Sequence, residues 1–307
     1  MDIKTQIKEI LQQKNRKLSE NSMKTYVSLL TSLYNKMNGE DIKFFIKKHV
    51  EIMEYINNLK SDASKKTILS AYYILTGLEP ARKLMVEIAQ KVNKKYSENT
   101  KSEKEKNNWL SQEKVDEIIL SRKTKVIALM NKKKIDMHEI FEIRDFLCVY
   151  LFFVVPPRRS RDYVFMKLKY TKNVNNIEYN FYDPKQKAFI FNNFKTDKYR
   201  GQDIVKITNN DELIFFEKLL KFWYKYNKTE FMIFNNDYKQ LDGSGLTRIL
   251  NKIFDAKISV NMLRHIKITD IYDNTSKSTV RDIIENLEKL SNDMGHSMAT
   301  QKKYYKK

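Results

Sequence analysis

The chain is poor in residues that break helices or cross-link the backbone. It has one cysteine, six glycines and four prolines among 307 residues. A single cysteine excludes a disulfide framework and predicts a reducing, intracellular compartment. So few glycines and prolines favour long helices. The four histidines and the cysteine are scattered without metal-ligand spacing, so we predict no metal site and no other cofactor.

Long apolar runs are also missing. The run from Phe146 to Val155 surrounds Cys148, which we expect to be an inert core residue. This run is too short to cross a bilayer, and Pro156 and Pro157 end it. The first residues, MDIKTQIKEI, lack the apolar stretch of a signal peptide. The sequence therefore predicts no membrane association.

Acidic residues are too few to balance the basic ones. Lysine and arginine number 58 against 38 acidic residues, which gives a net charge of +20. A charge of this size on a folded chain indicates a polyanionic partner, most often nucleic acid. The alternative is an AT-biased genome that has raised the lysine and asparagine content, so charge alone does not identify the partner.

The spacing of apolar residues divides the chain into two parts. Helical patterns in the first part cover 19–37, 41–59, 64–78 and 80–96. Residues 96–108 contain almost nothing apolar and are interpreted as a linker. We therefore predict a helical domain at 1–95, a linker at 96–108 and a second domain at 109–307.

The second domain combines helices with a region of strand character. Helices are predicted at 112–131 and 137–155, and again from about 211 to the end. Between them, alternating apolar residues and turn residues predict strands at 177–182, 188–191 and 203–207. The predicted fold class is mainly α, with a small antiparallel β-sheet in the C-terminal domain.

Short motifs in this second domain hold residues suited to phosphate chemistry. They are Arg159 to Asp162 after the double proline, Lys195-Thr196 between two predicted strands, Asn261 to His265 in a helical segment, and Met294-Gly295-His296. Tyr305 follows His296 by nine positions. In chain order the chemical groups are arginine, lysine, arginine, histidine and tyrosine.

This set is what a tyrosine needs to exchange one DNA phosphodiester for another. Attack by the phenol oxygen gives a pentavalent transition state with added negative charge. Two guanidinium groups hold that charge well, because each can bind two oxygens. The leaving 5′ oxygen takes a proton from a lysine or histidine. The tyrosine, with a usual pKa of about 10, needs a base or a positive field for activation.

From Trp109 to the end, the chain resembles the catalytic domain of the tyrosine recombinases, or phage-type integrases. Residues 1–95 resemble their helical core-binding domain, although this part of the chain carries no specific sequence motif. The amino-acid pattern of these motifs is most similar to that of recombinases of large DNA viruses and their satellite viruses. The resemblance implies that Arg159 and Arg264 hold the transition state and that His296 assists them. It also implies that Lys195 protonates the leaving oxygen.

The resemblance selects Tyr305 as the nucleophile that forms a 3′-phosphotyrosine. Tyr304 is the alternative nucleophile, because adjacent helical residues point about 100° apart and only one can enter the site. Asp162 is expected to orient the arginines. His265 either orients a catalytic group or is a satisfied core histidine. Asn261 departs from the family pattern of histidine or lysine, and asparagine cannot shuttle a proton near neutral pH.

Each residue also has a structural interpretation when it is taken alone. Arg159 could be a surface residue at a helix start, with Arg158 as the competing choice. Lys195 could be an ordinary loop lysine, with Lys198 as a nearby alternative. Arg264 lies among apolar residues, and an arginine there needs an anionic partner, for which a scissile phosphate is the best candidate.

We therefore predict a two-domain site-specific DNA recombinase or integrase that forms a clamp around double-stranded DNA. The resemblance implies a homo-tetramer on two DNA sites and, for a viral enzyme, action in the virus factory, host cytoplasm or host nucleus. One alternative is a type IB-like topoisomerase. The other is a DNA-binding protein of the same fold with weakened catalysis, which Asn261 favours.

Overall fold

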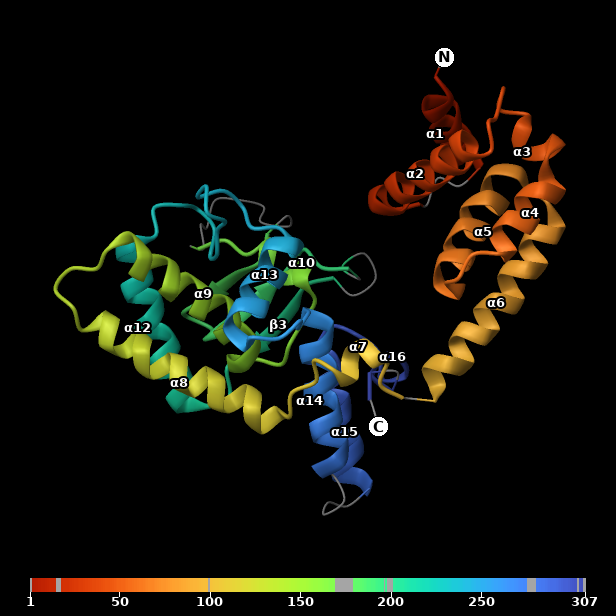
Figure 1. Ribbon diagram of the computed structural model, residues 1–307. Coiled ribbons are helices and arrows are strands. Elements are labelled where there is room, and N and C mark those ends of the chain that lie inside the picture. Colours follow the sequence, from red (N-terminus) through yellow and green to blue (C-terminus); the bar gives the residue numbers. More distant parts are fainter. Residues whose placement is uncertain are drawn as a thin grey trace. The chain divides into compact units, whose positions relative to one another are not determined.

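The computed structural model describes residues 2–14, 18–98, 100–168, 179–195, 197, 201–274, 280–302 and 304–305. The chain forms two compact units, Met1–Glu98 and Asn99–Lys307 (Figure 1). The first is helical, and the second combines helices with a three-stranded antiparallel sheet. The predicted fold class, mainly α with a small antiparallel sheet in the C-terminal part, is confirmed.

The first unit is built from amphipathic helices around one core. Its helices are α1 (Ile3–Lys14), α2 (Glu20–Lys36), α3 (Phe44–Lys47), α4 (His49–Asn57), α5 (Asp62–Thr76) and α6 (Glu79–Ser97). The side chains of Ser19 and Ser61 accept backbone N–H bonds and so cap α2 and α5. Gly77 ends α5 in the left-handed conformation that glycine adopts without strain.

Two features of this unit differ from the sequence prediction. Helix α1 was not predicted. The single helix expected at 41–59 is broken into α3 and α4 at Lys48. Next to the break, the buried hydroxyl of Tyr72 donates to the carbonyl oxygen of Phe45 at 2.6 Å. A tertiary hydrogen bond therefore occupies a carbonyl that local periodicity assigns to the helix.

The second unit begins with a short helix inside the polar segment 96–108. Its helices are α7 (Glu103–Lys106), α8 (Gln112–Met130), α9 (Met137–Val154), α10 (Ser160–Val164), α12 (Asn210–Tyr226), α13 (Gly243–Phe254), α14 (Val260–Asn274), α15 (Val280–Asp293) and α16 (Met298–Lys302). Helix α7 begins with a capping box, in which Ser102 and Glu105 bond to each other's backbone N–H. Helix α6 continues to Ser97, so the expected linker 96–108 contains the last two residues of α6 and the whole of α7.

The sheet has the order β1 (Phe181–Asp183), β2 (Ala188–Phe191) and β3 (Asp203–Lys206). Both strand pairs are antiparallel, with Ile190 of β2 opposite Phe181 on one side and Ile204 on the other. All three strands overlap the predicted ones. The first predicted strand began at residue 177, and residues 177 and 178 lie outside the described residues.

Helix α9 is the centre of the second unit. It is buried from Ile143 to Phe152, and α8, α12 and α13 pack around it. Cys148 is fully buried within it, and burial raises the pKa of its thiol, as befits an inert core residue. The chain leaves α9 through the double proline and reaches Arg158 and Arg159 just before α10. Among the helices that the structure describes, none is long and apolar enough to cross a membrane.

Candidate active site

Arg158 is a buried structural residue. Its Nε donates to Oδ2 of Asp162 at 2.8 Å, and its Nη2 donates to Oδ2 of Asp203 at 3.0 Å. Its Nη1 donates to the backbone oxygen of Asp293 at 2.8 Å, and its guanidinium lies over the ring of Phe191. Two carboxylates and a carbonyl oxygen therefore engage this side chain, which joins α10, β3 and α15.

Arg159 lies at the N-cap position of α10 and is only partly buried. Its Nη1 donates to the backbone oxygen of Gly295 at 2.8 Å. The first sequence motif thus contacts the Gly-His motif, which lies 136 positions later in the chain. Of the two neighbouring arginines, Arg159 is the one that faces the candidate site.

Gly295 is required at its position for two physical reasons. Its φ is +67°, a conformation that side chains other than glycine rarely adopt. A Cβ atom there would also lie 2.7 Å from Nη2 of Arg158. The turn after α15 can therefore approach the arginines closely only because it carries no side chain.

Arg264 is fully buried on α14. Its Nη1 donates to the hydroxyl oxygen of Tyr304 at 3.2 Å, and its Nη2 lies 3.5 Å from the backbone oxygen of Met294. Its Nε has no hydrogen-bond partner among the described residues. Burial and the nearby Arg159 lower the pKa of this guanidinium. A buried charge with an unused donor indicates a place for an anion.

Asp162 lies among the arginines. It is fully buried, and burial raises the pKa of its carboxyl, while the charges of Arg158, Arg159 and Arg264 act in the opposite direction. Its direct hydrogen bond is to Arg158. The carboxylate thus fixes the side chain of Arg158, the neighbour of Arg159.

His296 and Tyr304 pack against each other beside Arg264. His296 is buried, with Nδ1 3.3 Å from the backbone oxygen of Ser297. The rings of His296 and Tyr304 meet edge to face, with centroids 5.3 Å apart. The guanidinium carbon of Arg264 lies 4.7 Å from the centroid of the Tyr304 ring. The arrangement brings together a guanidinium, an imidazole and a phenol hydroxyl.

Tyr305 points to a different set of residues. Its hydroxyl donates to Oδ1 of Asp273 at 3.3 Å, and its ring lies 5.1 Å from the ring of Tyr272. Desolvation and the Asp273 carboxylate raise the pKa of Tyr305, which is opposite to the activation of a nucleophile. The spacing argument selected Tyr305, whereas the structure brings the hydroxyl of Tyr304 to Arg264.

Two further expected residues, Lys195 and Asn261, lie on the surface. Lys195 is exposed in the connection between β2 and β3. Asn261 is exposed in the first turn of α14 and lines a cavity of about 290 Å³ together with Lys257 and His265. The alternative lysine, Lys198, lies outside the described residues. The structure therefore clusters Arg159, Arg264, His296 and Tyr304, together with Asp162.

No family model matches the sequence, and no curated protein matches it. Among solved structures, the chain is similar to one described as the crystal structure of XerA recombinase. The sequence identity is 15% and the TM-score is 0.42, over 98% of this chain and 92% of that chain. At these values the similarity shows neither a family nor an activity.

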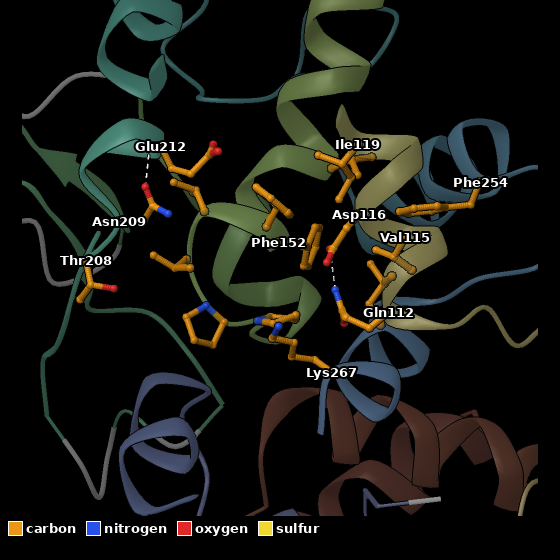
Figure 2. A pocket seen from close by; sticks show the side chains of 17 residues that line it. Gln112, Val115, Asp116, Ile119, Phe152, Thr208, Asn209, Glu212, Phe254 and Lys267 are labelled. Atoms are coloured by element: carbon orange, nitrogen blue, oxygen red, sulfur yellow. Dashed lines mark hydrogen bonds between the residues drawn. The ribbon is translucent and has the colours of Figure 1, made fainter. Parts of the chain in front are cut away.

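A second cavity, of about 330 Å³, shares no residue with the arginine cluster (Figure 2). Apolar side chains such as Phe152 and Phe254 line it, together with a few polar ones. Its polar groups bond to each other in part: Nε2 of Gln112 donates to Oδ1 of Asp116 at 2.7 Å. The cavity therefore lacks the convergent charges of the arginine cluster. In the part of the chain that the structure describes, no group of side chains is suited to hold a metal ion.

Two residues of the site could not be found from the sequence motifs. Asp203 holds Arg158 from the start of β3, and Glu105 holds His265 with Oε1 3.0 Å from Nδ1. The Ser-x-x-Glu pattern at Ser102 is a readable helix-start signal. It predicts the local helix but not the partner, which lies 160 positions away.

Proposed function

We propose that this protein cleaves and rejoins DNA strands through a covalent bond between DNA and Tyr304. The observation that carries the proposal is the hydrogen bond of 3.2 Å between Nη1 of the buried Arg264 and the hydroxyl of Tyr304. A guanidinium stabilises a phenolate and binds phosphate oxygens, so this position suits both the nucleophile and its target.

In the proposed step, the oxygen of Tyr304 attacks the scissile phosphorus and the bond to the 5′ oxygen breaks. The tyrosine loses its proton and the leaving 5′ oxygen gains one, so the product is a 3′-phosphotyrosine and a free 5′ hydroxyl. Reversal by the 5′ hydroxyl of another strand completes strand exchange. Because one phosphate ester replaces another, the reaction requires no energy source.

Arg159 and Arg264 hold the transition state in this mechanism. They come from different elements, α10 and α14, and both bond to the turn that contains Gly295. His296 lies against the Tyr304 ring, where it can assist the phosphoryl transfer. Lys195, exposed between β2 and β3, is assigned the proton donation to the leaving oxygen.

The net charge of +20 supports double-stranded DNA as the substrate. We assign non-specific phosphate binding to this charge and expect affinity to fall steeply with salt. The helical unit 1–98 is assigned the role of the second half of a DNA clamp. Site-specific recombination or integration by a tetramer on two DNA sites is the form of strand exchange that the resemblance implies.

Covalent trapping on nicked suicide DNA substrates tests the proposal. Ends of the source genetic element serve as candidate sites, and the variants are Tyr304→Phe and Tyr305→Phe. A denaturation-resistant adduct that only Tyr304→Phe abolishes would support the proposal. Loss of the adduct only in Tyr305→Phe would keep the chemistry and reassign the nucleophile.

The same substrates separate the alternatives. Relaxation of supercoiled DNA without any recombinant product would indicate a type IB-like topoisomerase. Tight, salt-sensitive binding to a confirmed site without an adduct in the wild-type protein would indicate a DNA-binding protein with weakened catalysis. In that case the substitution Asn261→His, which restores a proton-shuttling side chain, becomes the informative variant.

A further inference from the structure

The short helix α7 is bound to α14 within the second unit. Its residue Glu105 bonds to His265 of α14 through Oε1 at 3.0 Å. The other oxygen, Oε2, accepts hydrogen bonds from the backbone N–H and the hydroxyl of Ser102. Just beyond α7, Oδ1 of Asn108 accepts from the backbone N–H of Lys257 at 2.9 Å. The segment that follows the domain boundary thus packs against the residues just before α14 and against its second turn.

His265 connects this helix to the candidate nucleophile. Its ring lies 4.9 Å from the ring of Tyr304, centroid to centroid. The Tyr304 ring therefore contacts both His265 and His296, while its hydroxyl accepts a hydrogen bond from Arg264. The contacts form a continuous path from α7 through α14 to the phenol ring.

Both partners of the Glu105–His265 hydrogen bond are shielded from water. The side chain of His265 is 15% exposed and that of Glu105 is 17% exposed. A hydrogen bond to a charged group at such a site is stronger than an exposed one, and removal of one partner leaves a poorly solvated polar group. By contrast, Glu103 on the same helix pairs with its near neighbour Lys106, and its side chain is 82% exposed.

We infer that Glu105 is a positioning residue, which holds the Tyr304 ring for attack through His265. The inference rests on the proposed function, since it takes Tyr304 as the nucleophile. The segment between the two domains then has a role in the chemistry as well as in the connection. Phosphoryl transfer depends steeply on the placement of the attacking atom, so a loosened ring lowers the rate without changing DNA affinity.

The test compares Glu105→Ala, His265→Ala and the double variant, with Glu103→Ala as the matched control on the same helix. The readout is the rate of adduct formation in a single turnover at saturating DNA, alongside the DNA dissociation constant. We expect each single variant to lower the rate about tenfold with unchanged affinity, because only positioning is lost. The double variant should be no slower than the slower single variant. Glu105→Gln, which keeps the shape and a hydrogen bond, should recover most of the rate.

A second readout needs neither DNA nor catalysis. Acetylation of tyrosine hydroxyls by N-acetylimidazole, mapped by mass spectrometry, reports how firmly Tyr304 is held. Its labelling rate relative to that of the exposed Tyr238 should rise in Glu105→Ala and His265→Ala, and not in Glu103→Ala. Unchanged labelling, or a wild-type cleavage rate in Glu105→Ala, would overturn the inference. Absence of any wild-type adduct would instead count against the proposed function, and the labelling result would still decide the positioning role.

Discussion

Nη1 of Arg264 donates a hydrogen bond of 3.2 Å to the hydroxyl of Tyr304, across 40 positions of sequence. The guanidinium is fully buried, and the phenol approaches it from the C-terminal segment after α16. An apolar cluster of Ile268, Leu290 and Met294 anchors that segment against α14 and α15. The nucleophile assigned here therefore depends on packing at the very end of the chain.

Substitution of Arg264 by lysine should separate binding from chemistry. Lysine keeps the charge but lacks the planar fork with which a guanidinium can bind two phosphate oxygens while another N–H bonds to the hydroxyl of Tyr304. We expect the rate of adduct formation to fall by a factor of about 10² to 10³, as for other losses of a transition-state donor. The DNA dissociation constant should change little. Arg248→Lys on the exposed face of α13 is the control, and an equal loss there would refute the special role of Arg264.

The neighbours Arg158 and Arg159 should give opposite phenotypes. Arg158→Met removes the hydrogen-bonded cation from the fully buried Asp162 carboxylate and also removes the ion pair with Asp203, so we expect a loss of about 3–5 kcal/mol in the free energy of unfolding. Arg159→Met should retain near-normal stability and lose cleavage. Urea denaturation and the trapping assay measure the two quantities. A stable but inactive Arg158→Met would show that the functional roles are reversed.

Gly295 should be far less tolerant of alanine than Gly201. Both have a positive φ, +67° and +68°, so alanine carries a similar backbone cost of about 1 kcal/mol at each. Only at Gly295 would the new Cβ atom meet Arg158, whereas nothing lies within 4 Å at Gly201. Gly295→Ala should therefore lose more unfolding free energy than Gly201→Ala. This additional loss reports the close contact with Arg158, and we expect it to exceed about 2 kcal/mol. Equal losses would mean that Arg158 moves aside without cost.

Asp293→Asn should stabilise the fold at neutral pH. Burial raises the pKa of the Asp293 carboxyl above its usual 3.8, and Asp203 adds to this rise. The folded state then binds a proton more tightly than the unfolded state. The wild-type protein loses stability as pH rises from 3.8 through the folded pKa, and asparagine removes that loss. Unfolding free energies of the two proteins should agree near pH 3.5 and diverge by pH 7. A constant difference across that range would contradict the assignment.

Local rules predicted much of the secondary structure. The apolar stripe of α2, the polar segment after α6 and the strands β2 and β3 are all visible as sequence patterns. Two elements were not predicted correctly, for different reasons. Helix α1 has an apolar stripe of Ile3, Ile7, Ile10 and Leu11 that was missed, so its cause is local. The break at Lys48 lies beside a carbonyl bonded by Tyr72, which is 27 positions from Phe45.

The candidate site shows the same division. The motifs identified Arg159, Arg264 and His296, because side chains suited to phosphate chemistry recur there in a recognisable order. The choice between Tyr304 and Tyr305 could not be made by counting positions. Their side chains diverge, one towards Arg264 and the other towards Asp273, and α14 supplies both of these partners.

By itself, the sequence determined the helical fold class, the basic charge and the chemical groups that the site offers, since these follow from composition and short-range periodicity. Only the tertiary structure decided that Arg158 is structural and Arg159 is free to face the site. It also decided that Glu105 reaches His265. Each of these outcomes depends on carboxylates or helices more than 40 positions away, and no local pattern encodes which distant partner a buried charge will meet.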